Sequence, residues 1–412
     1  MTSTRPGAGR PTPTGPLRPS RPAAPRRSRP GESRSLGRRP AEEASGRPDQ
    51  SPAGARATAP SSPARPRGIG TPGRAIALSS VVLVIAVLVG IGVGPVRLSV
   101  PQILDALATR LPWHPSVAVP ALDTAIVWQI RLPRVILGVL VGSMLAGGGA
   151  AYQGIFRNPL ADPYLLGVAA GAGLGATIVI VSGGSQDLLP PAAFAGAVCT
   201  VALTYALGAR TGGSESPATR SGTGSILLAG VAVAALLTAL QTYLQQAHAQ
   251  ELADVYSWIL GGLSGATWSD VWLIVPYVAV AGTVLVIHRR LLDVLRVGET
   301  EATSLGVNVA RLRLTVVIAA TLGVSAAVAV SGLIGFVGII VPHAIRLTAG
   351  PSYRIVLPVS MIGGAAFLVL ADVAARTVQS PAEVPIGVIT ALAGGPFFLF
   401  VLRSRRARQD LT

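Results

Sequence analysis

Lysine is absent from this sequence of 412 residues, in which all 34 basic residues are arginine. A Walker A phosphate loop needs a lysine to hold the phosphates of ATP, so the chain cannot hydrolyse ATP by that route. Charged residues make up only 13% of the sequence and aromatic residues 5%, whereas half of the residues are hydrophobic. This composition, rich in glycine, alanine, leucine and valine, excludes an ordinary water-soluble domain and indicates a polytopic membrane protein.

Cysteine and histidine are almost as scarce. The single Cys199 excludes a disulfide within the chain, and the apolar stretch around it argues against thiol chemistry. The four histidines are scattered, and no two have a spacing such as i, i+4 that would let them hold one metal ion. We therefore expect no metal site, no cofactor and no catalytic residue in this chain.

The net charge of +16 is unevenly distributed. Residues 1–74 hold 15 arginines against four acidic residues, together with 15 prolines. Such a segment cannot bury enough apolar surface to offset the entropy that ordering would cost, so we predict a disordered cytoplasmic tail. Because the excess charge belongs to this tail, it does not indicate a nucleic acid partner.

Ten apolar runs follow the tail, each of about the length at which a helix crosses the hydrocarbon core of a bilayer. The run at 333–348 is the weakest, because Pro342 and His343 interrupt it. The ten runs cover roughly residues 75–94, 135–156, 164–182, 190–208, 225–246, 268–287, 314–331, 333–348, 354–371 and 384–402.

Arginine asymmetry predicts the orientation. With a cytoplasmic N-terminal tail and ten spans, the other inward segments carry 14 arginines and the outward loops carry five, as the positive-inside rule requires. We predict an all-α domain of ten spans over residues 75–403, a short cytoplasmic tail at 404–412 and a location in the cell membrane with both termini inside. In the first outward segment we expect a short surface helix over Val100–Leu111.

The most informative stretch runs from residue 131 to residue 167. Small residues recur at every fourth position of its apolar part, which places them on one face of a helix that a second helix can approach closely. Two arginines precede this part, and an N-P-L-A-D-P turn follows it at residues 158–163. The small residues are Gly138, Gly142, Ala146, Ala150 and Gly154, and the arginines are Arg131 and Arg134.

The next run contains glycines that imitate a nucleotide-binding motif. Gly171, Gly173 and Gly175 match part of a dinucleotide fingerprint, but no strand precedes them and they lie inside an apolar run. With Gly167, the fourfold spacing of Gly171 and Gly175 instead predicts a packing face.

Three further segments complete the pattern. Residues 288–313, HRRLLDVLRVGETEATSLGVNVARLR, are highly charged and favour helix. Residues 331–346 read S-G-L-I-G-F-V-G, then V-P-H and Arg346, and residues 370–390 contain L-A-D, Arg376 and E-V-P-I-G-V-I-T. In this order, with the R-L-P-R and N-P-L-A-D-P segments, they resemble the FecCD family of ABC importer permeases, which move iron-siderophore complexes, haem or vitamin B12. The resemblance covers about residues 75–403.

This resemblance implies a fold like that of the vitamin B12 importer permease, and a transport subunit that is not an enzyme. The subunit would pair with a second copy or a paralogue, and ABC ATPase subunits would bind it and use the ATP. An extracytoplasmic substrate-binding protein would deliver the cargo, which we expect to be a ferric siderophore. Haem or cobalamin is the alternative cargo. An ion-coupled secondary transporter would call for ionisable residues at mid-membrane, and the spans contain almost none.

The resemblance also implies roles for individual residues. Docking of the binding protein would use Arg131, Arg134 and Arg376, and a cytoplasmic gate would use Asn158 and Leu160. Coupling to the ATPase would use Gly298, Glu299, Ala302, Leu305 and Gly306, within the coupling segment 288–313. Simpler alternatives exist for the first two groups: arginines at a span end can reach the lipid headgroups, Arg376 can pair with Asp372 four residues before it, and asparagine is common in turns.

Uncharged polar residues cluster at the end of the run 225–246. Gln241, Thr242 and Gln245 would be costly at membrane depth unless they faced a partner or water. They therefore predict either a helix that lines the transport pathway or hydrogen bonds between helices, and the family resemblance favours the pathway.

Overall fold

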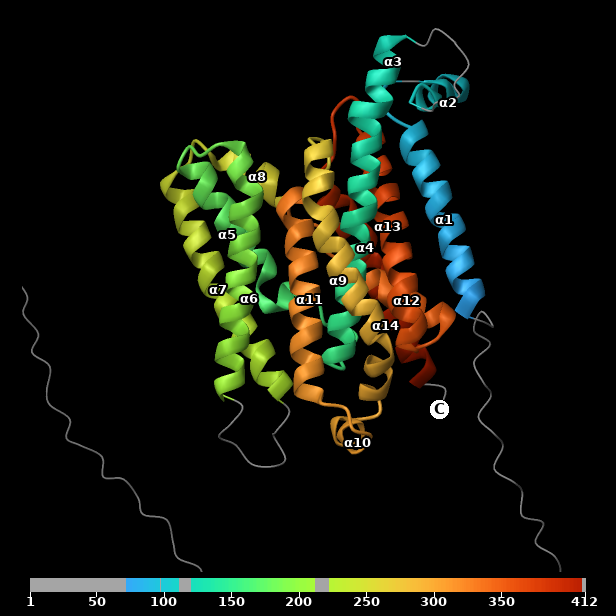
Figure 1. Ribbon diagram of the computed structural model, residues 1–412. Helices are drawn as coiled ribbons and strands as arrows, with labels where there is room; N and C mark the ends of the chain where they lie inside the picture. The colour runs from blue at the N-terminus through green and yellow to red at the C-terminus, as the bar shows by residue number, and fades with distance from the viewer. Residues whose placement is uncertain (1–71, 97, 111–119, 212–221, 410–412) are drawn as a thin grey trace, which may run out of the picture. The chain divides into compact units, whose positions relative to one another are not determined.

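The computed structural model describes residues 72–96, 98–110, 120–211 and 222–409, and every element of regular secondary structure in these ranges is a helix (Figure 1). The predicted all-α fold is thus confirmed for the described part of the chain. The predicted disordered tail lies outside the described residues as far as residue 71, and residues 72–74 begin the first helix.

Seven helices among the described residues are long and apolar enough to cross a membrane. They are formed by α1 (Pro72–Gly92), α4 (Leu132–Ile155), α6 (Leu189–Thr211), α7 (Gly222–Ala247), α9 (Trp268–Leu295), α11 (Val309–Ser331) and α13 (Tyr353–Thr377). Three shorter apolar helices come from α5 (Val168–Val181), α12 (Val337–Ala349) and α14 (Ile386–Gln409). Each of the ten predicted runs therefore contains an apolar helix, while the number of crossings stays a prediction.

Short helices connect the long ones. These are α2 (Val100–Ala108), α3 (Ala121–Ala125), the π-helix η1 (Ile126–Arg131), the 3-10 helices η2 (Pro163–Leu166) and η3 (Gln186–Leu188), α8 (Leu252–Ile259) and α10 (Glu299–Ser304). The expected surface helix is present as α2, which begins with a capping box between Ser99 and Gln102. Because α3 and η1 run directly into α4, this helix begins at residue 121 rather than 135. The sequence concealed the extension because it is partly polar.

The small-residue face of α4 packs against α13, as predicted. A Cβ atom added to Gly142 would lie 2.3 Å from the carbonyl oxygen of Gly364, and one added to Gly154 would lie 3.1 Å from the ring of Tyr353. The backbone contact at Gly142 leaves room for hydrogen and for nothing larger, and at Gly154 the ring of Tyr353 would have to move slightly to admit a Cβ atom. Helix α4 also contacts α9, α11 and α12, so it is the central helix of the described bundle (Figure 1).

The glycines of α5 likewise form a packing face, against α6. A Cβ atom at Gly171 would lie 2.3 Å from the carbonyl oxygen of Gly196, and one at Gly175 would lie 2.3 Å from that of Ala192. Helices α5, α6 and α7 thus form a second group beside the first (Figure 1). Cys199 lies on the exposed side of α6.

Three interruptions of the helices meet and bond to one another. The amide of Gly262, after α8, donates to the carbonyl of Ser331 at the end of α11 (2.9 Å). The amides of Ile386 and Gly387, where α14 begins, donate to Gly261 and Leu260 at 3.2 and 3.1 Å. Irregular backbone is tolerated in a membrane only where such groups find partners, so the meeting of these breaks is what makes each of them possible.

Candidate functional site

Five charged side chains gather where α1 ends and α4 begins; we call Arg131, Arg134, Asp372, Arg376 and Glu383 the arginine cluster. Arg134 is its centre. Its Nη1 and Nη2 atoms donate to the two oxygens of Glu383 at 2.8 and 2.9 Å, and its Nε donates to Asp372 at 2.9 Å. One guanidinium therefore ties α4 both to α13 and to the segment that joins α13 to α14, in the forked geometry that makes arginine–carboxylate pairs strong.

The other two arginines of the cluster hold the end of α1. Arg131 donates to the carbonyls of Ile91 and Gly92 at 2.6 and 2.9 Å, and also to that of Val96. Arg376 donates to the carbonyl of Gly90 at 2.8 Å, and its Nη2 lies 3.3 Å from Asp372. These carbonyls lack partners within their own helix, and positive charge is favourable at a helix C-terminus.

The structure therefore places the three predicted docking arginines inside the protein. Arg131, Arg134 and Arg376 are all buried, and their charged groups bond to groups of the same chain. The intrahelical pair considered for Arg376 is present, whereas Arg131 and Arg134 do not extend toward lipid headgroups. Only Glu383 is partly accessible, and the hydrogen bonds from Arg134 hold the pKa of its carboxyl below the usual value. Glu383 lies in the E-V-P-I-G-V-I-T motif, but its position in the sequence does not indicate that its partner is Arg134.

The coupling segment lies at the opposite end of the bundle, where α10 projects between α9 and α11 (Figure 1). Ala302 is fully buried, and the side chain of Glu299 forms an ion pair with Arg313 of α11 at 2.6 Å. Gly306 has φ +83°, a conformation that favours glycine. Leu305, directly after α10, points outward and is 70% exposed. Buried Ala302 and the Glu299–Arg313 pair therefore fix α10 on the protein, while an apolar side chain beside it faces away from the protein.

Asp293, near the end of α9, joins the coupling segment to α13. Its carboxylate accepts hydrogen bonds from the hydroxyl of Ser352 (2.6 Å) and from the amide of Tyr353 (2.6 Å). Arg296 and Arg354 lie within ion-pair distance. The carboxylate therefore satisfies the free amides at the start of α13, which no residue of α13 itself caps. The role of Asp293 could not be predicted from the sequence, because its partners lie about 60 residues away.

A chain of hydrogen bonds continues from Tyr353 to the end of α4. The hydroxyl of Tyr353 bonds to Arg346, and Arg346 donates to the side-chain oxygen of Gln153. Gln153 then donates to the carbonyl of Gly338 at 3.0 Å. This carbonyl is available because its usual partner, four residues on, is Pro342, which has no N–H. Pro342 therefore does not interrupt α12, and the freed carbonyl connects α12 to α4.

The predicted gate residues lie in the turn between α4 and η2. The side-chain oxygen of Asn158 accepts a hydrogen bond from the amide of Leu160 at 2.9 Å, which is a local turn contact, and Leu160 is exposed. Asp162 bonds to the amide of Tyr164 at 2.8 Å, and burial raises the pKa of its carboxyl to about 6. The turn is thus shaped by both acceptor side chains, although only Asn158 was singled out from the sequence.

The three polar residues predicted on α7 lie in different environments. Gln241 is buried and donates to the hydroxyl of Thr177 on α5 at 3.2 Å, which is the helix–helix hydrogen bond considered as the alternative. Thr242 is exposed and donates to the carbonyl of Thr238 in its own helix, and Gln245 is half-buried. The structure therefore does not bring the three side chains together. Among the described residues, no group of three or more His, Cys, Asp or Glu side chains could hold a metal ion.

Comparison with known proteins defines the class of this protein. The model of the FecCD transport family matches residues 82–404, and the chain belongs to that family. It is therefore a multi-pass membrane protein of the ABC permease type, in agreement with the resemblance of its motifs.

Individual relatives are similar over most of their length. The chain is 44% identical over 291 residues to the cobalamin import system permease protein BtuC of Halobacterium salinarum, covering 70% of this chain and 76% of that protein. It is 37% identical over 345 residues to the hemin transport system permease protein HmuU of Yersinia pestis, covering 80% and 95%. A solved ABC transporter assigned to the metal-chelate type, in an inward-facing conformation, is 30% identical with a TM-score of 0.70, covering 81% of this chain and 99% of that one.

Proposed function

We propose that this chain is the membrane subunit of a binding-protein-dependent importer that carries a chelated metal into the cell. The observation that carries this proposal is the family match over residues 82–404, together with a structural likeness that covers almost all of a metal-chelate-type transporter. Two copies, or this chain and a paralogue, would enclose the pathway. A separate ATPase would supply the energy, because the chain has no lysine for a Walker A loop.

The coupling segment is the proposed contact with that ATPase. Its exposed Val297 and Leu305 offer apolar side chains on either side of the short helix α10, which buried Ala302 and the Glu299–Arg313 pair hold in place. Movement of α10 and the end of α9 would displace Asp293 and, with it, the start of α13. The hydrogen bonds through Tyr353, Arg346 and Gln153 extend this link to α4 and the turn with the proposed gate residues Asn158 and Leu160.

The binding protein would dock at the end that holds the arginine cluster. Because Asp372 and Glu383 already occupy Arg134, carboxylates of a partner could reach this arginine only by displacing Glu383, the more accessible of the two acids. Docking through Arg131 and Arg376 would further require the release of α1. This orientation puts the coupling segment and both termini in the cytoplasm, and it follows the arginine asymmetry of the loops.

For the cargo we propose a ferric siderophore, with cobalamin as the second candidate, favoured by the relative that is 44% identical. The test is uptake of labelled ferric siderophores, haem and cobalamin by cells that lack their own permease. These cells would express this chain with its ATPase and binding protein. We expect ATP-dependent uptake of one chelate class. Uptake of cobalamin alone would show that the cargo is cobalamin and not a ferric siderophore. Uptake without the ATPase would refute the ABC mechanism.

A further inference from the structure

Apolar side chains form a row along one face of α11, which we call the ridge, and an arginine lies at its N-terminal end. Leu314, Ile318 and Leu322 are spaced to lie on one face of the helix, and Arg311 lies on the same face one turn before them. Ile318 is 49% exposed, and Arg311 is exposed too. Arg311 forms no ion pair with any described residue, whereas Arg313 is occupied by Glu299.

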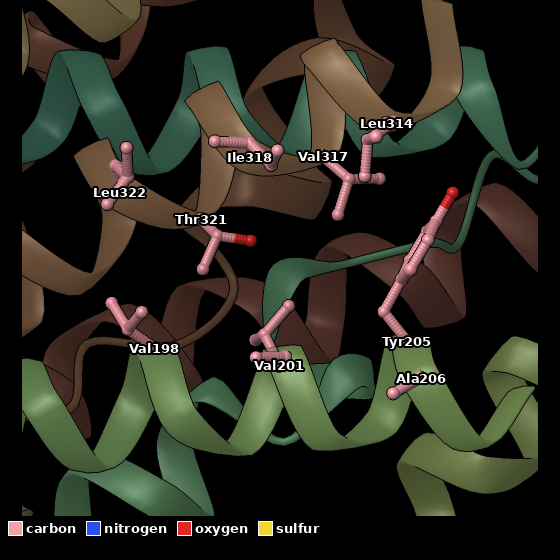
Figure 2. Close-up of a pocket in the computed structure, with 10 residues that line it drawn as sticks. Val198, Val201, Tyr205, Ala206, Leu314, Val317, Ile318, Thr321 and Leu322 are labelled. Carbon is pink, nitrogen blue, oxygen red and sulfur yellow. The ribbon is translucent and has the colours of Figure 1, made fainter. Parts of the chain in front are cut away.

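A groove runs along one flank of this ridge, between α6 and α11 (Figure 2). Its volume is about 310 Å³, and Val198, Val201 and Ala206 line it opposite Ile318 and Leu322. The two hydroxyls in the lining belong to Thr321, which bonds to Tyr152 at 2.7 Å, and to Tyr205, near the Arg311 end. The rest of the lining is hydrocarbon.

A second groove follows the other flank, between α9 and α11. It has a volume of about 600 Å³, and Tyr277, Val280 and Val284 of α9 line it. Ile318 and Leu322 border this groove as well as the first. One row of side chains therefore separates the two apolar grooves, and the exposed Arg311 lies at the end of that row.

We propose that the ridge and its two grooves bind one anionic diacyl phospholipid, with an acyl chain on each flank and the phosphate at Arg311. The grooves open on a face of a membrane protein where acyl chains are the surrounding solvent, and the cation completes a charge match with the headgroup. A second copy of the chain fits the face of α7 better, because α7 exposes its apolar side chains more fully, among them Leu228 at 72% and Tyr243 at 68% against 49% for Ile318. The proposal needs only the membrane location and does not depend on the cargo or the ATPase.

The test uses the purified full-length chain with phosphatidylglycerol or phosphatidylcholine of identical acyl chains, and native mass spectrometry to count retained lipid. We expect the chain to retain phosphatidylglycerol preferentially. Arg311→Gln should weaken its binding about fivefold, because one arginine near an anionic lipid contributes about 1 kcal/mol. Arg311→Lys should keep most of the preference. The matched control is Arg290→Gln, which removes an exposed arginine from a part of α9 that does not line the groove.

A second pair of variants tests the grooves themselves. Ala202→Trp would fill the groove beside α6, and should lower retention of both lipids. Leu203→Trp places the same ring on the exposed side of α6 but outside the lining, and should leave retention unchanged. Thermal unfolding of each variant shows whether it is folded. Equal retention of the two lipids by the unmodified chain, or undiminished phosphatidylglycerol binding by Arg311→Gln, would overturn the proposal, as would a dimer that Ala202→Trp dissociates.

Discussion

The two ends of the bundle use charge in opposite ways. In the arginine cluster, Arg134, Asp372 and Arg376 are buried, and each of them bonds to another helix. At the coupling segment, charges lie nearer the surface, and two apolar side chains, Val297 and Leu305, are 72% and 70% exposed. The comparison teaches that the first end is built to hold helices together, whereas the second leaves apolar side chains uncovered, as the proposed contact with the ATPase requires.

The largest expected effect comes from breaking the arginine cluster. Arg134→Met would leave the carboxylate of Asp372 buried with only Arg376 beside it, and loss of one partner of a buried pair costs about 3–5 kcal/mol. We expect a large fall in the thermal unfolding temperature of the purified chain. The double variant Arg134→Met, Asp372→Leu should recover little of the loss, because it also removes the ion-pair partner of the buried Arg376. An unchanged unfolding temperature for the single variant would mean that the cluster does not hold the bundle.

Removal of the link between the coupling segment and α13 should have the next largest effect. Asp293→Ala would leave the first amides of α13 without their acceptor, at a cost of about 1–3 kcal/mol. If this link transmits movement, the variant should hydrolyse ATP in the assembled transporter but lose most of its uptake per ATP. Asp270→Ala, which removes a capping carboxylate at the other end of the same helix, is the control. Equal loss in both variants would indicate a purely structural role.

A smaller effect is expected at the surface of the coupling segment. Leu305→Asp should weaken binding of the ATPase about tenfold, because it places a charge in an apolar contact. Since the side chain is exposed in the chain itself, the unfolding temperature should change little. Binding can be measured by co-purification at graded ATPase concentrations, with exposed Leu188→Asp as the control outside the coupling segment. ATPase binding equal to that of the unmodified chain would remove Leu305 from the interface.

The smallest expected effect is on the stability of the protein at low pH. The pKa of Glu383 is lowered by Arg134, so its contribution to stability is present above its unfolded value and is lost as the pH falls through the lowered one. Because Glu383 is partly exposed, we expect no more than about 1 kcal/mol. Glu383→Gln should flatten the unfolding temperature between about pH 5 and pH 3. A slope identical to that of the unmodified chain would show that Arg134 depends on Asp372 alone.

Much of the fold could be predicted because apolar runs and small-residue spacing are local signals. The stripe from Gly138 to Gly154 needed only its own sequence to reveal a packing face. The site was harder to predict, since its contacts join distant parts of the chain: Arg134 meets Glu383 across 249 positions. The burial of the three arginines could not be foreseen, because an arginine at the end of a span looks the same whether it faces a partner protein or a carbonyl of its own chain.

The exposed position of Cys199 on α6 has a practical consequence. Because Cys199 is the single thiol of the chain, a dye that reaches it once detergent replaces the lipid would attach at one defined place, next in sequence to a groove residue, Val198. Since lysine is absent, amine-reactive reagents have no side chain to label in any of the helices. The unaltered polypeptide therefore already provides a single reporter position for fluorescence measurements beside α11.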